Sequence, residues 1–585
     1  MFVVFYKEGF MKALRSLIAI LLVSLMVLTV ASCNGSVAET TATTGQQGTQ
    51  EGTTNESTAG ETFDPLGKYD PEIDLTTVKL FYSWVAFPEG DSIEDNVWTR
   101  RYKDELGINV EFSWIVPEDQ YQTKLNASIA SNDIPDIMNV DEPTFVMCVK
   151  SGLIQPLDEV FSQYASDDLK SQVYGGELGE ASFNYGKIDG KLMALPGPMS
   201  HPVEGASVLY IRKDWLDNLS LSEPKSLDDV FAIIEAFTKN DPDGNGENDT
   251  FGIGISNDAL ASGFAYGIGD VLGIYNGYHA NPGIWQEDSS GNLVFGSIQP
   301  EMKPALAKIN ELFKAGYIDK EFGVKDRWKV GEDVAAGKIG LLYGVGWTPV
   351  VPLVNSYKND DSAIWKAYPI PSIDNEPAKV NGWSWGSGFN VVSKNCKNPE
   401  ALIKLANLSF DTLHGSYAKA NPDALNTFVR DKEGKYEAVH YQVVSMYPGD
   451  KNLKNQFALK EALNNNDPSK LSPEVINQYN AVVKWLHGDR TVDPWNNWHL
   501  KEALGVVAFD YYEKDLYLAN KFNAVQTPTM LEKMGTLNDM ASQVFTKIIM
   551  EGNTDAEFDM FVDNWKKLGG DTITQEVNDW YKSLK

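Results

Sequence analysis

Short apolar runs alternate with stretches of helical periodicity in the first part of the chain. Residues 78–84 (VKLFYSW) and 108–115 are typical of strands, whereas residues 93–106 and 121–130 carry the apolar spacing of helices. A third strand is predicted to start within residues 135–138. Strands and helices that alternate at this pace predict a parallel sheet with right-handed crossovers.

The same alternation resumes after Leu209, and the last third of the chain becomes mostly helical. Apolar periodicity predicts helices over residues 399–410, 473–486, 500–517, 531–550 and 556–568. With 585 residues, 43% of them hydrophobic, the chain is globular and too long for a single core. Two large lobes or several domains are therefore expected.

A charged and then apolar leader opens at Met11. Lys12 and Arg15 precede an apolar run over residues 16–29, which is short for a permanent transmembrane helix. The run ends in Val-Ala-Ser-Cys at Cys33, which resembles the lipobox of bacterial lipoproteins. The resemblance implies cleavage before Cys33, a lipid on its sulfur, and a chain anchored at the outer face of the cell membrane. The alternatives are an ordinary secretory signal or a single anchor helix.

The stretch that follows Cys33 is polar and of low complexity. Residues 34–64 are almost wholly Asn, Gly, Ser, Thr, Gln, Glu and Ala. Such a composition buries too little apolar surface to offset the entropy lost on ordering. We therefore predict a signal peptide over residues 1–33 and a disordered tether over residues 34–73.

Charge and cysteine content narrow the class of partner. The net charge is −31; the leader through Cys33 carries +2, so the remainder is near −33. A body this acidic repels phosphate backbones, which argues against nucleic-acid binding. Cys148 and Cys396 are the cysteines beyond Cys33. We expect two free buried thiols, because two cysteines in so large a body do not form a disulfide framework.

Five short segments follow one another in a recognisable order. They are residues 131–137 (SNDIPDI), 151–157 (SGLIQPL), 189–196 (DGKLMALP), 209–215 (LYIRKDW) and 337–340 (GKIG). In series they resemble the extracellular solute-binding proteins of the maltose-binding type, which are the substrate-capturing subunits of ABC importers. Residues 295–301 and 527–565 are similar to the larger lipoprotein branch of that family.

The resemblance implies an α/β fold of the type II periplasmic-binding-protein kind, with two parallel-sheet lobes, a cleft and a helical C-terminal portion. The first lobe is expected over residues 74–200 plus about 386–495, and the second over 201–385 plus about 496–585. One crossing between them should follow Pro196. Another should lie within residues 383–390, with the helix from Pro399 returning to the first lobe.

The function implied is a membrane-anchored binding protein, not an enzyme. It would capture an oligosaccharide in the cleft and deliver it to the subunits of an ABC permease, acting as a monomer. Two alternatives stay open: a surface-displayed polysaccharide-degrading enzyme, and a sensor or peptide-binding lipoprotein on the same fold. We expect a neutral plant- or host-derived ligand of several sugar units, because the body is so acidic.

Residues 241–249 (DPDGNGEND) carry the sharpest metal-binding pattern. Their oxygen side chains stand at positions 1, 3, 5 and 9 of a calcium loop, with Gly246 at position 6 for the sharp turn. The predicted ligands of a structural Ca²⁺ are Asp241, Asp243, Asn245, Glu247 through its carbonyl oxygen, and Asp249. The alternative is an acidic turn after a helix.

The calcium loop departs from the full pattern at its end. Position 12 is Gly252 instead of a glutamate, and position 10 is Thr250, where members of the family often carry an acid. A further ligand must then come from Thr250, from water or from a distant side chain. We therefore expect a structural ion rather than a switch.

The resemblance also places candidate ligand-binding residues. Aromatic faces pack on sugar rings, and carboxylates accept hydrogen bonds from hydroxyl groups. Trp347 follows a predicted strand over 339–343, at the place of a cleft aromatic, and Glu204 lies just past the first crossing. The full set is Trp347, Glu204, Asp141, Glu142, Trp84, Trp383, Trp385 and, for a ligand carboxylate, Arg212. The alternative for each tryptophan is packing in a core or a hinge.

Motifs for enzymes are weak. Residues 382–386 (GWSWG) fit the nucleophile elbow G-x-S-x-G, but that elbow needs a helix next, and residues 387–392 are typical of a strand. The six histidines form no zinc-binding spacing. Carboxylate pairs suited to glycoside hydrolysis occur by chance among 81 acidic residues, so none is singled out.

Overall fold

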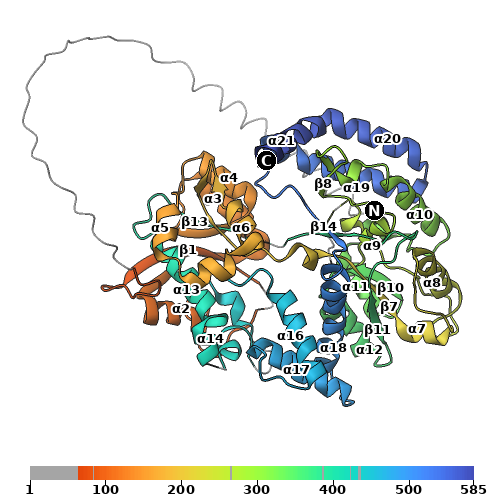
Figure 1. The fold of residues 1–585 in the computed structure, drawn as a ribbon, viewed down its shortest axis with the longest axis horizontal. Coiled ribbons are helices and arrows are strands. Elements are labelled where there is room, and N and C mark those ends of the chain that lie inside the picture. The colour runs from red at the N-terminus through yellow and green to blue at the C-terminus, as the bar shows by residue number, and fades with distance from the viewer. Residues whose placement is uncertain are drawn as a thin grey trace, which may run out of the picture. The chain divides into compact units, whose positions relative to one another are not determined.

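A computed structural model describes residues 63–584, except 83–84, 262, 264–266, 385, 387, 422 and 432–435. The predicted leader, Cys33, most of the predicted tether, Trp84 and Trp385 lie outside the described residues. Thr62–Lys585 form one compact unit. Within it, the elements fall into two groups (Figure 1). One group surrounds two hydrophobic clusters, together called the first core, and the other surrounds one large cluster, called the second core. A small fourth cluster lies within residues 459–479.

The first core is built around five strands. β1 (Ile73–Phe81) pairs in parallel with β2 (Ile108–Pro117), as predicted. β13 (Phe389–Val392) lies between β3 (Ile137–Val140) and β6 (Leu195–Pro196) and is antiparallel to both. The prediction of parallel pairing is therefore confirmed for β1 and β2, whereas the third predicted strand, β3, pairs antiparallel with β13. That strand runs the other way because the chain re-enters this sheet from the second lobe.

Helices cover this sheet, and a hairpin of β4 (Lys187–Ile188) and β5 (Lys191–Leu192) adjoins it. Eleven of the fourteen residues of α13 are buried, so this helix lies inside the core. The helices are α2 (Val97–Arg101), α3 (Glu118–Ala130), α4 (Glu142–Lys150), α5 (Asp158–Tyr164), α6 (Gly176–Tyr185), α13 (Glu400–Leu413), α14 (Ser416–Ala420) and α15 (Ala424–Phe428). Short π-helical turns are η1 (Tyr102–Leu106) and η2 (Leu169–Val173), and a 3-10 turn is η8 (Ala438–Tyr441).

The folded body begins earlier than predicted. Lys404 on α13 donates to the carbonyl oxygens of Asp64 and Gly67, at 3.3 and 2.6 Å. Tyr69 donates to Glu400 at 2.7 Å and packs against the first core. Residues 64–69, which the prediction included in the tether, thus belong to the folded body, because α13 supplies polar partners that this stretch lacks by itself.

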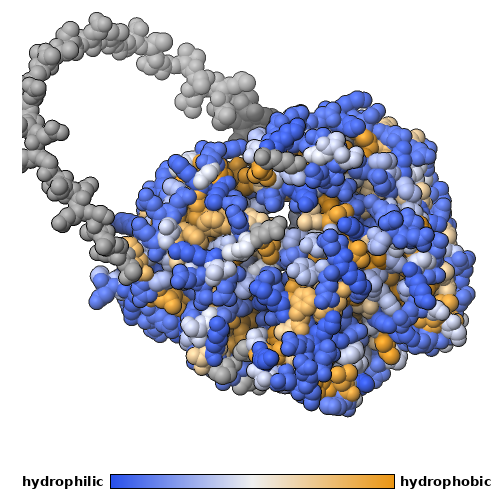
Figure 2. Space-filling model, viewed as in Figure 1, coloured by the Kyte–Doolittle hydropathy of each residue, from blue (hydrophilic) through white to orange (hydrophobic). Residues whose placement is uncertain are grey.

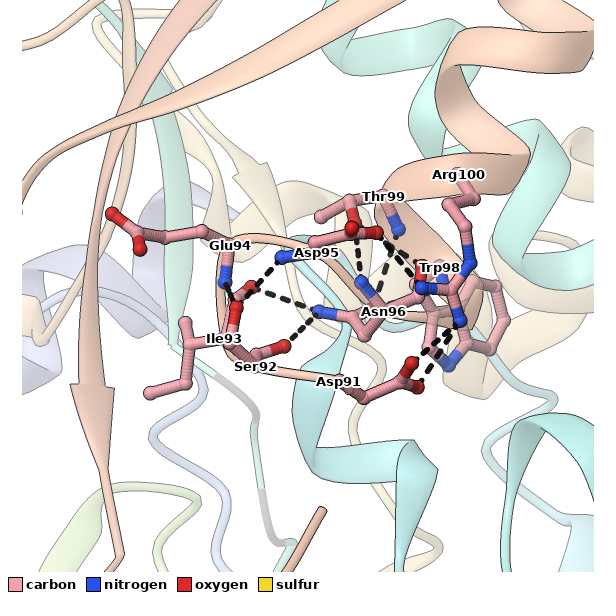
Figure 3. Close-up of polar contacts among 9 residues, drawn as sticks. All are labelled: Asp91, Ser92, Ile93, Glu94, Asp95, Asn96, Trp98, Thr99 and Arg100. Atoms are coloured by element: carbon pink, nitrogen blue, oxygen red, sulfur yellow. Dashed lines mark hydrogen bonds and ion pairs between the residues drawn. The ribbon is translucent and has the colours of Figure 1, made fainter. Parts of the chain in front are cut away.

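The loop that leads into α2 shows how a helix start is fixed (Figure 3). The side-chain oxygen of Asn96 accepts from the backbone N–H groups of Trp98 and Thr99, at 2.9 and 3.3 Å. Thr99 Oγ1 accepts in return from the backbone N–H of Asn96, which completes a capping box. Arg100 reaches back to Asp91 and Asp95 and ties the helix to the loop before it.

The second core surrounds an antiparallel sheet in which β7 (Val208–Arg212) lies between β10 (Leu341–Gly344) and β11 (Trp365–Tyr368). Two further pairs are β8 (Trp285–Glu287) with β9 (Leu293–Phe295), and β12 (Val380–Gly382) with β14 (Tyr517–Ala519). The helices are α7 (Lys213–Asn218), α8 (Leu227–Lys239), α9 (Leu272–Gly277), α10 (Met302–Lys314), α11 (Arg327–Ala335), α12 (Val354–Asn359), α16 (Lys451–Asn465), α17 (Pro473–Leu486), α18 (Val492–Gly505), α19 (Pro528–Glu551), α20 (Thr554–Trp565) and α21 (Asp571–Ser583). The short turns are η3 (Pro202–Gly205), η4 (Asn257–Ala259), η5 (Gly296–Ile298), η6 (Phe322–Val324), η7 (Pro349–Leu353), η9 (Val506–Tyr512) and η10 (Lys566–Gly570).

Two expected boundaries differ in this part of the chain. The helix predicted over 500–517 ends as α18 at Gly505, and a π-helical turn and strand β14 follow. The segment 451–495, expected in the first lobe, contributes Leu453, Trp485 and Trp495 to the second core. Its apolar residues alone do not reveal which of two cores they join.

Segments that connect the two cores are hydrogen-bonded to one another. Met199 forms a β-bridge with Gly386, and the backbone N–H of Trp383 donates to the Pro202 carbonyl at 2.7 Å. These contacts lie at the positions where the two crossings are expected. A third, which the sequence did not indicate, passes Gly449, whose carbonyl oxygen accepts from the His201 N–H at 3.0 Å. We call these three segments, which are residues 199–205, 383–386 and 449–452, the hinge strip.

The visible surface is mostly polar, and the two described cysteines lie in the interior. One face is mostly hydrophilic, with apolar residues in small separate patches (Figure 2). Cys148 and Cys396 are both buried and free, as predicted, and burial raises the pKa of each thiol to about 11. Among the described residues, no helix combines the length and apolar character needed to cross a bilayer.

Candidate ligand-binding site

A cavity of about 400 Å³ opens in the first core. Its walls come from β1, β3, β13 and the segment 439–445 that includes the end of η8. The polar and aromatic lining residues include Lys79, Tyr82, Tyr121, Asn139, His440 and Ser445. Tyr82 follows the carboxyl end of β1, and Asn139 precedes that of β3, where ligands collect in open α/β sheets.

Hydrogen bonds fix the polar groups of this cavity. The Tyr121 hydroxyl donates to the Asn139 carbonyl at 3.0 Å, and the Asn139 amide donates to Asn390 Oδ1 at 3.1 Å. Lys79 Nζ donates to the backbone carbonyl of Gln442. Burial lowers the pKa of Lys79 to about 8. The cavity thus holds aromatic surface, amides and one ammonium group that is costly to keep charged.

Asp141 and Glu142 lie beside this cavity, at the junction of β3 and α4. Asp141 Oδ1 caps α4 by accepting from the Thr144 N–H at 3.0 Å. Burial and the charge of Asp141 raise the pKa of Tyr121, which lines the cavity, to about 12. Glu142 accepts from the backbone N–H of Gln526, in the segment that leads to α19. Burial raises the pKa of Glu142 above its usual range.

Glu204 and Trp383 belong to the hinge strip. Glu204 Oε2 accepts from the side-chain amide of Asn452, near the start of α16, at 2.7 Å. Its Oε1 is buried without a hydrogen-bond partner among the described residues. Burial raises the pKa of Glu204 to about 7. Trp383 packs on Gly205, where a Cβ atom would lie only 2.4 Å from the Trp383 carbonyl oxygen.

Trp347 and Arg212 both belong to the second lobe but differ in availability. Trp347 is 40% exposed, and its indole lies on Gly267, where an added Cβ would meet the ring at 2.3 Å. Arg212 is 3% exposed and forms a bidentate pair with Asp214, at 2.8 and 2.6 Å. A second carboxylate, Asp360, lies 3.3 Å from the Arg212 guanidinium. The Arg212 guanidinium is therefore paired within its own lobe, with one carboxylate on α7 and one just after α12.

The loop 241–249 folds around its own acidic residues. Asp241 accepts from the backbone N–H groups of Asn245 and Gly246, each at 3.0 Å, and Gly246 has a φ of +83°. The Asn245 amide contacts Asp243 at 2.9 Å and Asp249 at 3.3 Å. Burial and Asp241 together raise the pKa of Asp243, as gathered like charges do.

The loop offers the oxygen donors that a hard cation prefers. In this structure, however, the carboxylates of Asp241, Asp243 and Asp249 contact Asn245. No group of three His, Cys, Asp or Glu within the described ranges is already set as a metal cluster. Thr250, one of the open choices for an added ligand, donates its hydroxyl to the Phe237 carbonyl at 2.7 Å and is buried. The Thr250 hydroxyl is therefore hydrogen-bonded to α8 and is not directed at the loop.

Sequence reasoning missed most of the cavity. Lys79, Tyr121, Asn139 and His440 lie far apart in the chain and meet only in the fold. One signal was available: Lys79 stands next to Val78 and Leu80 in an apolar part of the strand, and a lysine in such a place has a reason to be there. His440 lies in a segment without periodicity.

Comparison with known proteins decides the family. Residues 86–410, more than half of the 585, match the family model of the bacterial extracellular solute-binding proteins. The chain belongs to this family. This solute-binding protein is 25% identical over 524 residues to the polygalacturonan/rhamnogalacturonan-binding protein YtcQ of Bacillus subtilis (strain 168), which covers 89% of the chain and 94% of YtcQ. It is also 25% identical over 521 residues to the fructooligosaccharide ABC transporter substrate-binding protein FusA of Streptococcus pneumoniae, covering 83% and 87% of the two chains.

Solved structures show the fold of this solute-binding protein. An EF-hand mutant of FusA in complex with fructo-nystose matches with a TM-score of 0.60 at 18% identity, over 88% of this chain and 100% of FusA. The alginate-binding protein AlgQ2 without calcium ion matches with a TM-score of 0.57 at 15% identity, over 89% and 100% of the two chains. The fold is thus the expected two-lobed α/β fold, and the two named relatives are binding proteins rather than enzymes.

Proposed function

We propose that this solute-binding protein captures an oligosaccharide between its two lobes and delivers it to an ABC permease. The observation that carries the proposal is the cavity that the first lobe presents at the carboxyl ends of β1 and β3. The relative YtcQ is named as a polygalacturonan/rhamnogalacturonan-binding protein, and FusA as the substrate-binding protein of a fructooligosaccharide ABC transporter. Tyr82 and Tyr121 offer ring surface there, and Asn139 offers an amide. Trp347 supplies a partly exposed aromatic ring from the second lobe.

Binding, not chemistry, is the functional event in this proposal. A ligand that contacts both lobes favours the closed arrangement by the sum of those contacts, and the loaded form then engages the permease. The hinge strip contains three hydrogen-bonded segments through which the lobes would move. Glu204 and Trp383 lie in that strip, so we assign them to the hinge as well as to the edge of the site. Asp141 and Glu142 complete the rim on the first lobe.

The lipobox-like sequence at Cys33 supports attachment to the outer face of the cell membrane. The polar tether over residues 34–62 would let the body stand off the lipid surface. A single copy with two lobes suffices for the proposed capture, so we propose a monomer.

A structural Ca²⁺ belongs to the same proposal. Asp241, Asp243, Asn245 and Asp249 would hold it, together with the Glu247 carbonyl, because hard cations take oxygen ligands from such loops. The names of the FusA EF-hand mutant and of calcium-free AlgQ2 indicate that proteins of this fold have calcium sites. The ion would rigidify the turn between α8 and the strand region that follows.

The proposal is tested with a panel of defined oligosaccharides on the soluble chain that starts after Cys33. We expect at least one oligosaccharide to raise the melting temperature, to bind with one-to-one stoichiometry by calorimetry, and to be recovered intact after hours of incubation. Shortened or unsaturated products would favour the surface enzyme instead. If peptides bind and no sugar does, the sensor or peptide-binding alternative replaces the proposal.

A further inference from the structure

Lys79 is the cationic side chain that lines the cavity of the first lobe. It lies inside strand β1 and is partly buried. Its Nζ donates to the Gln442 carbonyl, a neutral acceptor that also lines the cavity. No ion pair joins Lys79 to a carboxylate within the described residues, in a protein where acidic residues outnumber basic ones by 81 to 50.

The other groups around this cavity leave the ammonium without compensation. His440 from η8 stacks edge-on with Tyr82 at 5.6 Å and contacts Glu437 at 3.3 Å; burial and nearby Lys79 both lower the pKa of His440, while Glu437 raises it. Two acidic residues near the cavity act on tyrosines. Burial and the charge of Glu118 raise the pKa of Tyr82. Burial and the charge of Asp141 raise the pKa of Tyr121. Asn139 and Ser445 are uncharged.

A partly buried ammonium that lacks a counterion loses hydration that a neutral carbonyl replaces incompletely, so a charged partner would stabilise it. A ligand carboxylate is such a partner, because it forms a short charge-assisted hydrogen bond with an ammonium. The cavity of about 400 Å³ has room for a sugar ring beside it. Tyr82 and Tyr121 line the same cavity and could contact that ring.

We propose that Lys79 binds a carboxylate of the captured glycan, so that the ligand is an acidic oligosaccharide of the uronate class. This inference rests on the proposed function, since it names the sugar that the same site takes. It departs from the neutral ligand expected from net charge. Net charge acts over distances that salt screens beyond roughly 8–10 Å, whereas Lys79 acts by contact inside the cavity.

The test compares tetragalacturonate with its carboxyl-reduced, neutral counterpart by calorimetry. In Lys79→Met the charge is lost while the chain length is nearly kept, and Lys79→Arg keeps the charge. Lys150→Met is the matched control, because Lys150 is exposed at the far end of α4 from Asp141 and Glu142. Melting curves establish that each variant is folded.

We expect the unmodified protein to prefer the acidic tetramer. Lys79→Met should weaken that binding about 10- to 100-fold, which is the range for losing a charge-assisted hydrogen bond, and should leave binding of the neutral tetramer unchanged. Lys79→Arg should retain the preference, and Lys150→Met should match the unmodified protein. Affinity for the acidic tetramer should also fall above about pH 8 in the unmodified protein, and the pH response should be absent in Lys79→Met.

The outcomes separate this inference from the function on which it rests. If the unmodified protein binds neutral oligosaccharides as tightly as acidic ones, or Lys79→Met keeps full affinity for the acidic tetramer, the Lys79 inference is overturned and oligosaccharide capture stands. If neither tetramer binds while a neutral oligosaccharide of the panel does, the Lys79 inference alone is overturned. If no oligosaccharide of the panel binds either, both are overturned. A preference for the acidic tetramer that persists in Lys79→Met moves the carboxylate site elsewhere in the protein.

Discussion

Replacing Glu204 by glutamine should make the stability of this protein less dependent on pH. Glu204 lies in the hinge strip with one oxygen bonded to Asn452 and the other buried without a partner among the described residues. Burial raises the pKa of its carboxyl from 4.5 to about 7. The folded protein therefore holds the Glu204 proton more tightly than the unfolded chain does.

The direction and size of the effect follow from that shift. The contribution of Glu204 to stability is fully present below about pH 4.5 and is lost as the pH rises toward 7, because ionisation is easier in the unfolded chain. A shift of that size, at 1.36 kcal/mol per pKa unit, corresponds to a loss of about 3 kcal/mol at most. Glutamine keeps an acceptor for Asn452 and has no charge to lose. Relative to the unmodified protein, Glu204→Gln should gain up to about 3 kcal/mol between pH 4.5 and pH 8.

The assay is urea denaturation followed by tryptophan fluorescence at several pH values from 4.5 to 8. The quantity compared is how the difference in unfolding free energy between Glu204→Gln and the unmodified protein changes with pH. Any cost of the amide that does not depend on pH therefore cancels. Glu461→Gln, on the exposed side of α16, is the control and should give a constant difference. If the stability curves of Glu204→Gln and the unmodified protein run parallel over this range, the carboxyl of Glu204 is not held protonated by the fold.

Three other predictions follow from particular contacts. Asn96→Ala should lower the unfolding free energy, measured with urea, by about 1 kcal/mol, because it removes the cap of α2 (Figure 3). Asn126 is exposed on α3, and Asn126→Ala should leave the unfolding free energy unchanged. Equal losses in the two variants would show that the cap has no special role. Chelation or Asp241→Ala should lower the melting temperature with little change in ligand affinity, since an ion held a hundredfold above its dissociation constant adds about 2.7 kcal/mol; an unmoved melting curve means an acidic turn only. Trp347→Ala should weaken oligosaccharide binding by about 1–3 kcal/mol in calorimetry, and full affinity in that variant would place the stacking surface elsewhere.

Local patterns predicted local structure well. The strand and helix periodicity of the first lobe corresponds to β1, β2, α3 and β3, and the run after the GWSWG motif is β13, as expected for a strand. Helices α13, α17, α19 and α20 lie within a few residues of the predicted ranges. In each case the buried face repeats at the period of the element, so the signal is contained in neighbouring residues.

What the sequence did not reveal depends on partners far along the chain. The third hinge segment is recognised only by the contact between Gly449 and His201, which lie about 250 residues apart. The start of the folded body depends on Lys404 and Glu400 of α13, which pair with residues 64–69. Arg212, chosen as a carboxylate binder, is paired by Asp214 and Asp360, the second of which is distant in sequence.

The central claim is that a glycan is held between two lobes that close on it, and small-angle scattering of the soluble chain tests it most directly. The measurement compares the radius of gyration of the empty protein with that of the protein saturated by its tightest oligosaccharide, both in calcium. Closure of the lobes predicts a smaller radius when the ligand is bound. An unchanged radius at proven saturation would contradict capture by closure.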